Sequence, residues 1–140
     1  MDEYTSKLRV WGLTCPGFPE EVSRARRWTR DILSHSPHAD DVALIVSELG
    51  ANALVHTASG DGTGTFHITL ALSDLVIAIS VTDSGSGTAP TIEHPGTDAT
   101  HGRGLGMVAA LADNVEIHGD HHGHTITAEL LMPHPGVAAC

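Results

Sequence analysis

Three polar residues in the middle of the chain are spaced four apart: Glu48, Asn52 and His56. Residues four apart meet on one face of an α-helix, so a helix here would carry a polar stripe. A carboxylate can act as a general base, and an amide oxygen is among the hard oxygen ligands that Mg²⁺ prefers. An ordinary solvated helix face has the same spacing, so the stripe by itself leaves both interpretations open.

A second candidate is the carboxylate of Asp83, which is followed by alternate glycines at Gly85 and Gly87. The residues up to Val81 are typical of a strand, so Asp83 is expected at a strand end. A carboxylate there can accept hydrogen bonds from a flat polar ligand, and the glycines let the backbone approach that ligand closely. An ordinary turn that contains an aspartate is the alternative interpretation.

A third candidate is the glycine-rich segment 101–107. It places an arginine among alternate glycines, in the order Gly102, Arg103, Gly104, Leu105 and Gly106. Glycines leave backbone N–H groups free, and the N-terminus of a helix attracts phosphate. Arg103 is the only base after residue 30 and can pair with a phosphate oxygen. The spacing is a poor match to the dinucleotide-binding pattern G-x-G-x-x-G, and a glycine-rich linker is the alternative.

The charge balance excludes several classes of nucleotide site. The 140 residues include 17 acids against 7 bases, for a formal net charge of −10. Lys7 is the single lysine, so a P-loop or a kinase site built around an interior lysine is excluded. Residues 1–30 hold six bases and four acids, whereas residues 31–140 hold one base and thirteen acids. Phosphate backbones need a cationic face, so nucleic acid is not expected as a direct partner.

Two helices are predicted in the first half of the chain. Pro19 suits a first helical position, and apolar residues then recur at helical spacing as far as Leu33. A second helix is expected after Asp40 or Asp41, either of which can cap it. Its apolar stripe lies beside the polar one and consists of Val42, Ile45, Val46, Leu49 and Ala53. The second helix would therefore present the polar stripe next to the protein core.

From Phe66 onward the apolar period changes from 3.6 to 2, which predicts strands. Two of them are joined by a tight turn at Ser73-Asp74 and must pair antiparallel. Residues 84–104 show no periodicity and are expected to form a long loop that leads into a short helix over 105–111. Two further strands follow, and a weak first strand is expected between Leu8 and Leu13.

The resulting order, β-α-α-β-β-loop-α-β-β, predicts an α+β fold. We expect a two-layer sandwich in which a mixed, mainly antiparallel sheet packs on about three helices. Length suits one domain, with a strand segment over 1–15, the main domain over 16–132 and a tail over 133–140. The acidic N-terminus is not a secretory signal and no apolar run is long enough to span a bilayer. A cytoplasmic protein without membrane contact is therefore expected.

The order of the motifs resembles the N, G1, G2 and G3 boxes of the GHKL ATPase superfamily (gyrase, Hsp90, histidine kinase, MutL). The boxes are Glu-x-x-x-Asn on a helix, Asp-x-Gly-x-Gly after a strand, Gly-x-Gly-x-Gly into a helix and Gly-His-Thr at 123–125. The resemblance spans residues 16–131 and implies the Bergerat ATP-binding fold, which has no P-loop. The short chain, the arginine-bearing first helix and the run Ser-Glu-Leu-Gly-Ala-Asn-Ala at 47–53 are most similar to anti-sigma-factor serine/threonine kinases of the partner-switching type.

This resemblance implies a role for the residues around the base and the metal. Asp83 would accept a hydrogen bond from the adenine amino group of ATP, and Thr125 would support that contact. Gly85 and Gly87 would let the chain pass the base. Asn52 would bind the Mg²⁺ ion that bridges the phosphates.

The resemblance also implies the phosphate contacts and the chemistry. Backbone N–H groups of the 102–106 glycines would bind the phosphates, with Arg103 and Leu105 in the same box and residues 88–101 as a lid. Glu48 would be the general base for an attacking serine hydroxyl, and His56 would lie near the phosphates. Phosphoryl transfer depends mainly on positioning and charge neutralisation, which suits such a site.

The implied partners are a sigma factor and an anti-anti-sigma protein that carries the serine. A regulatory module that sequesters a partner without catalysis is the alternative, and a detached histidine-kinase catalytic domain is a third. Trp11 and Trp28 are expected in the core or in a contact between two copies, so a homodimer stays open.

The sequence also contains a cluster of histidines and a cluster of arginines. His118, His121, His122 and His124 crowd a predicted hairpin, where adventitious metal binding is the more frequent outcome. Arg24, Arg26, Arg27 and Arg30 lie on the first helix, as a docking surface for an acidic partner or as a solvated face.

Overall fold

The elements of the protein follow the predicted order. The computed structural model describes residues 8–56, 64–84, 99–120 and 123–132. In chain order the elements are β1 (Arg9–Pro16), α1 (Pro19–Ile32), α2 (Ala39–His56), β2 (Thr65–Leu72), β3 (Val76–Asp83), α3 (Ala99–Leu111), β4 (Asn114–Asp120) and β5 (Gly123–Leu131). The predicted alternation of helices and strands is confirmed.

The strands form one five-stranded sheet in the order β1-β2-β3-β5-β4. All four pairings of these described strands are antiparallel, rather than mixed as expected. The reason is the position of β5, which lies between β3 and β4 and separates two strands that run in the same direction. The predicted α+β sandwich is confirmed. The last strand of the chain, β5, lies inside the sheet, and β4 forms the edge next to it.

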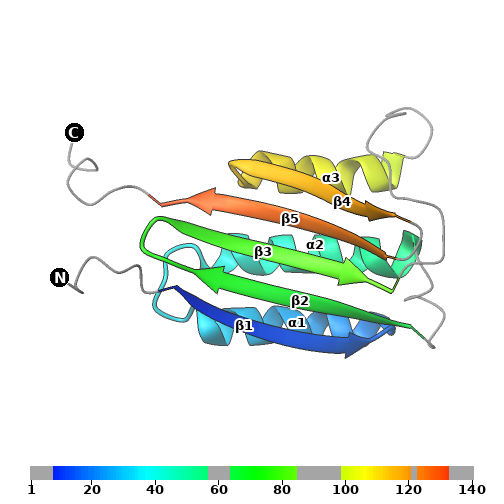
Figure 1. Ribbon diagram of the computed structural model, residues 1–140, viewed down its shortest axis with the longest axis horizontal. Helices are drawn as coiled ribbons and strands as arrows, with labels where there is room; N and C mark the ends of the chain where they lie inside the picture. The colour runs from blue at the N-terminus through cyan, green and yellow to red at the C-terminus, as the bar shows by residue number, and fades with distance from the viewer. Residues whose placement is uncertain (1–7, 57–63, 85–98, 121–122, 133–140) are drawn as a thin grey trace.

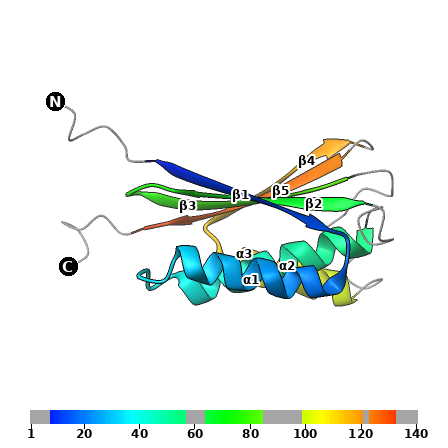
Figure 2. The same cartoon turned by 90° about the horizontal axis from the view of Figure 1, so that it is seen from below.

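The three helices cover one face of the sheet, as Figure 2 shows, and none of the described elements covers the other. In Figure 1, α2 runs behind the middle of the sheet between α1 and α3. Side chains on a strand alternate between the two faces. Along β3, half-buried and buried side chains alternate from Val76 to Asp83. The buried side chains are those that face the helices.

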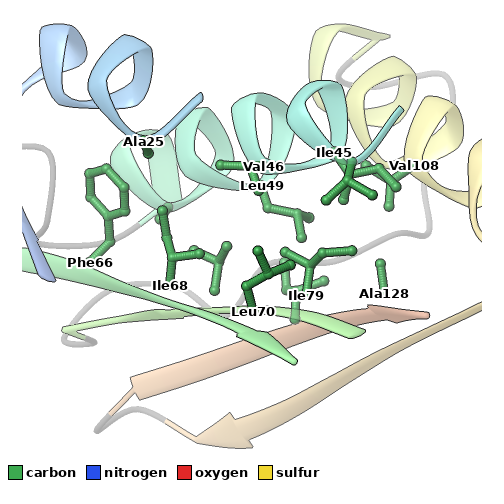
Figure 3. Packing of buried hydrophobic residues seen from close by; sticks show 14 of the residues in the cluster. Ala25, Ile45, Val46, Leu49, Phe66, Ile68, Leu70, Ile79, Val108 and Ala128 are labelled. Atoms are coloured by element: carbon green, nitrogen blue, oxygen red, sulfur yellow. The ribbon is translucent and has the colours of Figure 1, made fainter. Parts of the chain in front are cut away.

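The core lies between α2 and the sheet (Figure 3). Val46 and Leu49 of α2 face Ile68, Leu70 and Ile79 of the central strands, all at most 1% exposed. Burying each such side chain contributes about 1.5–3 kcal/mol to stability. This packing fixes α2 over the centre of the sheet and thereby fixes the direction of its neighbouring polar stripe.

The starts of the first two helices differ in how well the sequence predicts them. Pro19 opens α1, as expected, with two acidic residues in the first turn. In contrast, α2 begins at Ala39, so Asp40 and Asp41 lie in its first turn rather than at the cap. Their carboxylates still favour the positive end of the helix. Asp40 also lies 3.5 Å from the Nε of Arg30, which links the start of α2 to the end of α1.

The third helix begins at Ala99, well before the predicted start at Leu105. Its glycines have low helix propensity, which conceals the first turns in the sequence. Packing overrides that propensity, because Leu105 and Val108 are buried in the core. In the ranges that the structure describes, no helix is both long and apolar enough to cross a membrane.

Candidate functional site

The predicted motifs gather at one end of the sandwich. At the right of Figure 1 lie the C-terminal end of α2, the end of β3, the start of β5 and the N-terminus of α3. These segments are far apart in the sequence, and the antiparallel strand order brings their ends together. The polar stripe of α2, the carboxylate of Asp83 and the start of the glycine segment therefore belong to the same end of the molecule.

Asp83 is a buried carboxylate at the end of an apolar strand, with 9% of its surface exposed. On one side it pairs with the buried Phe66 of β2. On the other side its Oδ1 accepts a hydrogen bond from the backbone N–H of His124, at 3.1 Å. Burial makes hydrogen bonds to a carboxylate strong, so Asp83 is well placed to bind a donor group.

In the sequence, His124 belongs to the histidine cluster and is not assigned to the site of Asp83. It is 4% exposed, and its Nδ1 lies 3.9 Å from Asp83 Oδ1. This Nδ1 is buried and has no hydrogen-bond partner in the described part of the structure. The alternation along β5 could have indicated that His124 is buried. His124 lies two residues before Ile126 and four before Ala128, so it shares the face of the strand on which these two are buried.

The structure does not bring Thr125 to Asp83, in contrast to what the motif resemblance implies. Neighbouring residues on a strand point to opposite faces, so Thr125 points away from the helices where His124 points toward them. Its Oγ1 lies 2.8 Å from the Oγ1 of Thr82, also on the open face. On the helix side, the residue of β5 that faces Asp83 is His124.

Close backbone contact holds the start of β5 against β3. A Cβ added at Gly123 would lie 3.0 Å from the carbonyl oxygen of Asp83. At Gly119, where φ is +125°, a Cβ would lie 2.7 Å from the Cα of His124. Glycines at these two positions therefore let the hairpin of β4 and β5 set His124 beside Asp83.

On α2, Glu48 and Asn52 are half-buried and one helical turn apart, beside the buried Leu49 and Ala53. The predicted polar stripe therefore borders the core at the same end of the molecule as Asp83. An amide oxygen at this place suits Mg²⁺ with phosphate, and a carboxylate suits a proton acceptor. His56 closes the helix, and its side chain lies outside the described residues.

The glycine segment lies inside α3 rather than before it. An α-helix leaves only its first four N–H groups, counted from the cap residue, without a partner in the helix, so with α3 beginning at Ala99 this set ends at residue 101. The N–H groups of Gly102, Gly104 and Gly106 all lie farther along the helix, where its own hydrogen bonds use them. Leu105 packs into the core. Phosphate binding by the N–H groups of Gly102, Gly104 and Gly106 would therefore require the first turns of α3 to unwind.

Several predicted site residues lie outside what the structure describes. These are Gly85 and Gly87, residues 88–98 of the lid expected over 88–101, and the side chain of Arg103. The remaining residues of that expected lid, 99–101, belong to α3. Within the described ranges, no group of three or more His, Cys, Asp or Glu residues is arranged to hold a metal ion.

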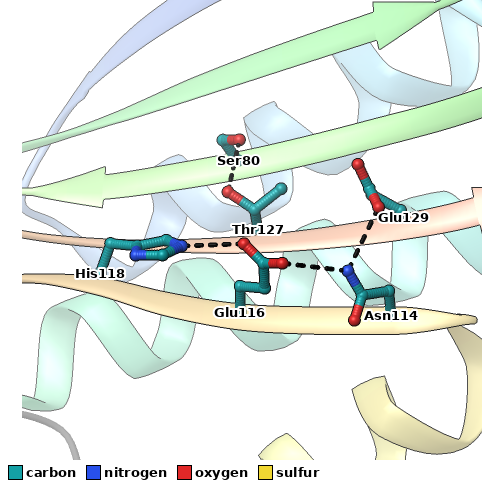
Figure 4. Close-up of polar contacts among 6 residues, drawn as sticks. All are labelled: Ser80, Asn114, Glu116, His118, Thr127 and Glu129. Carbon is teal, nitrogen blue, oxygen red and sulfur yellow. Dashed lines mark hydrogen bonds and ion pairs between the residues drawn. The ribbon is translucent and has the colours of Figure 1, made fainter.

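The two described members of the histidine cluster lie on opposite faces of the sheet. His118 is on the open face, where its Nε2 lies 2.8 Å from Glu116 Oε1 (Figure 4). The hydrogen bonds from His118 and Asn114 hold the pKa of the Glu116 carboxyl below its ordinary value. His124 is buried under the helices, so these two imidazoles do not form one site.

The arginine cluster lies exposed on α1. Arg24 makes an ion pair with Glu21 at 2.7 Å, and Arg30 approaches Asp40. Arg24 also covers the buried Cys15 of β1, and burial raises the pKa of that thiol.

Comparison with known proteins gives a family match and likenesses to solved structures. Residues 15–130 match the family model described as histidine kinase-like ATPase domain. No curated protein matches the sequence. The fold is similar to the crystal structure of the RsbU and RsbW domains of Rv1364c from Mycobacterium tuberculosis, with a TM-score of 0.67 and 22% identity over 89% of this chain. The match covers 33% of the mycobacterial chain, so this protein spans about a third of its length.

A second likeness is to the SiaB–SiaC complex from Pseudomonas aeruginosa. Here the TM-score is 0.59 and the identity 14%, over 86% of this chain and 88% of the other. At these identities the two structures support the fold.

Proposed function

Because this chain belongs to the family of histidine kinase-like ATPase domains, we propose that it binds ATP with Mg²⁺ at the end of the sheet that holds Asp83. The observation that carries this proposal is the buried carboxylate of Asp83 beside the buried His124. A carboxylate in this environment accepts strong hydrogen bonds, and the amino group of adenine is a suitable donor. The half-buried polar stripe of α2 belongs to the same end of the molecule.

The side chains present fit this ligand. Asp83 would hold the amino group of the base, and the amide oxygen of Asn52 would bind the Mg²⁺ ion that bridges the phosphates. The first N–H groups of α3 and the positive end of that helix would stabilise phosphate charge. Bound ATP supplies a transferable phosphoryl group.

We further propose that the protein is a serine/threonine kinase of the partner-switching type. Its substrate would be the serine of an anti-anti-sigma protein, and it would sequester a sigma factor when that substrate is absent. Glu48 would accept the proton of the attacking hydroxyl. The motif resemblance supports this proposal, together with the fold likeness to an RsbW domain and to SiaB, which is described in a complex with SiaC.

Isothermal titration calorimetry with Mg·ATP tests the binding proposal. We expect D83N to weaken ATP binding by about 1.5–3 kcal/mol, the scale of a hydrogen bond to a charged group. The matched control is D74N, which makes the same charge change in the exposed turn between β2 and β3. We expect D74N to bind ATP like the wild type.

Two results would contradict the proposal in different ways. Absence of ATP binding by the wild-type protein would refute the nucleotide site. An unchanged dissociation constant in D83N would remove Asp83 from it. ATP binding without transfer to any anti-anti-sigma protein would favour the sequestering module over the kinase.

A further inference from the structure

We propose that His124 reads the nucleotide base together with Asp83, by donating a hydrogen bond from its Nδ1 to the ring nitrogen beside the adenine amino group. This inference rests on the proposed ATP site, and it assigns the second base contact to a residue other than Thr125. It makes His124 a specificity-determining residue for adenine.

The first observation is the state of the imidazole. His124 is 4% exposed, and its Nδ1 is buried without a hydrogen-bond partner in the described part of the structure. Buried polar atoms are almost always hydrogen-bonded, and each exception needs an explanation. A ligand that supplies the missing partner would relieve the cost of burying this nitrogen.

The second observation is the place of that nitrogen. The Nδ1 lies 3.9 Å from Asp83 Oδ1, on the same helix-facing side of the sheet. The hydrogen bond from the His124 backbone N–H to Oδ1 holds the two residues in this register. Two polar atoms at this separation can contact neighbouring atoms on the edge of one planar ring.

The two groups complement adenine and not guanine. Adenine presents an amino donor next to a ring nitrogen that accepts, which matches a carboxylate acceptor next to an imidazole N–H donor. Guanine presents a carbonyl acceptor in place of the amino group, which would face the carboxylate of Asp83 with two acceptors opposed. A neutral imidazole can carry its proton on Nδ1, so it can act as the donor.

Three variants separate this role from a structural one. H124L fills a similar volume without polar atoms, whereas H124N keeps a polar group at the position of Nδ1 and H124Q moves it to the position of Nε2. T127V serves as the matched control, because the hydroxyl that it removes bonds Ser80 on the open face of the sheet, away from Asp83 (Figure 4). Calorimetry with Mg·ATP and Mg·GTP gives the dissociation constants, and thermal unfolding without nucleotide gives Tm.

We expect H124L and H124Q to weaken ATP binding about tenfold, and H124N to stay within about threefold of the wild type. GTP binding should change little, so the preference for ATP should fall. The Tm of free H124L should be equal to or above that of the wild type, since a buried polar atom without a partner is removed. A purely structural role would instead lower Tm and affinity together.

The outcomes are distinguishable from failure of the proposed function. If the wild type binds no ATP, the nucleotide site itself is refuted. If the wild type binds ATP and folded H124L binds it equally well, the inference is overturned. Should H124L fail to fold, equal affinities of H124N and H124Q would overturn it. Loss of affinity in T125V but not in the His124 variants would overturn it in favour of Thr125.

Discussion

Glu48 and Asn52 are the residues on which the choice between a kinase and a binding module depends. Both are half-buried on α2, and one turn of helix separates them. An amide can bind a metal without any proton transfer, whereas a base must change its protonation state. Removing the carboxylate while keeping its shape therefore separates catalysis from binding.

We expect E48Q to keep ATP affinity within about threefold and to lose phosphoryl transfer by about 10²–10⁴-fold, the usual contribution of a general base. The measurement is transfer of labelled phosphate from ATP to a serine of an anti-anti-sigma protein. E116Q is the matched control, because Glu116 lies exposed on the open face and bonds His118. Full transfer by E48Q would show that Glu48 is not the base.

At the scale of elements, the hairpin of β4 and β5 positions His124 beside Asp83, the pair that we propose binds the base. Gly119 carries a φ of +125°, which L side chains rarely adopt, and it pairs with His124. A Cβ there would collide with the carbonyl oxygen of Gly123 and approach the Cα of His124 to 2.7 Å. Glycine at this position therefore lets the hairpin pair this closely while it holds His124 beside Asp83.

We expect G119A to lower the free energy of unfolding by about 1–3 kcal/mol through backbone strain. We also expect it to weaken ATP binding, because the added methyl group would displace the backbone of Gly123 and His124. Urea denaturation and calorimetry measure the two effects.

The control for G119A is G50A on α2. A Cβ at Gly50 would meet Val22 at 3.4 Å and Phe66 at 3.5 Å, which is ordinary van der Waals contact. Alanine also favours the helix by roughly 0.5–1 kcal/mol over glycine, so G50A should be at least as stable as the wild type. A G119A protein as stable as G50A would contradict the strain at the hairpin.

The third helix shows how an element can constrain a motif. With α3 beginning at Ala99, the N–H groups of all three alternate glycines lie beyond the four that the start of a helix leaves free. The helix end still attracts anions through its dipole. The phosphate roles of Gly102, Gly104 and Gly106 thus stay a prediction that depends on a change in the first turns of α3.

At the scale of the whole molecule, charge decides how a nucleotide can bind. The net charge is −10, and Arg103 is the only base after residue 30. A free nucleotide is itself strongly anionic, so the acidic domain must repel it. Backbone N–H groups and a divalent cation have to supply most of the positive field.

We therefore expect removal of Mg²⁺ with EDTA to weaken ATP binding by about tenfold or more, or about 1.4 kcal/mol. The effect should grow at low ionic strength, where the repulsion is less screened. Calorimetry with and without Mg²⁺ at two salt concentrations measures it, and ADP provides a comparison with one phosphate fewer. Equal affinity with and without Mg²⁺ would show that the cation does not bridge the phosphates.

Much of the fold follows from local patterns that the sequence carries. Helical spacing of Val42 and Leu49 predicts α2, and alternation after Phe66 predicts the paired strands, since each pattern reflects burial of one face. The order of the motifs likewise indicates the ATPase family. The start of α3 could not be predicted, because tertiary packing of Leu105 and Val108 outweighs the low propensity of the glycines.

The sequence by itself determined the residue types, their spacing and which residues of each strand share a face. Only the tertiary structure decided which residue of β5 faces Asp83, because that depends on β5 entering the sheet between β3 and β4. Parity within a strand is a local property, whereas strand neighbours and register are set by long-range pairing and core packing. For this reason the sequence motif indicated Thr125, and the folded chain places His124 beside the carboxylate.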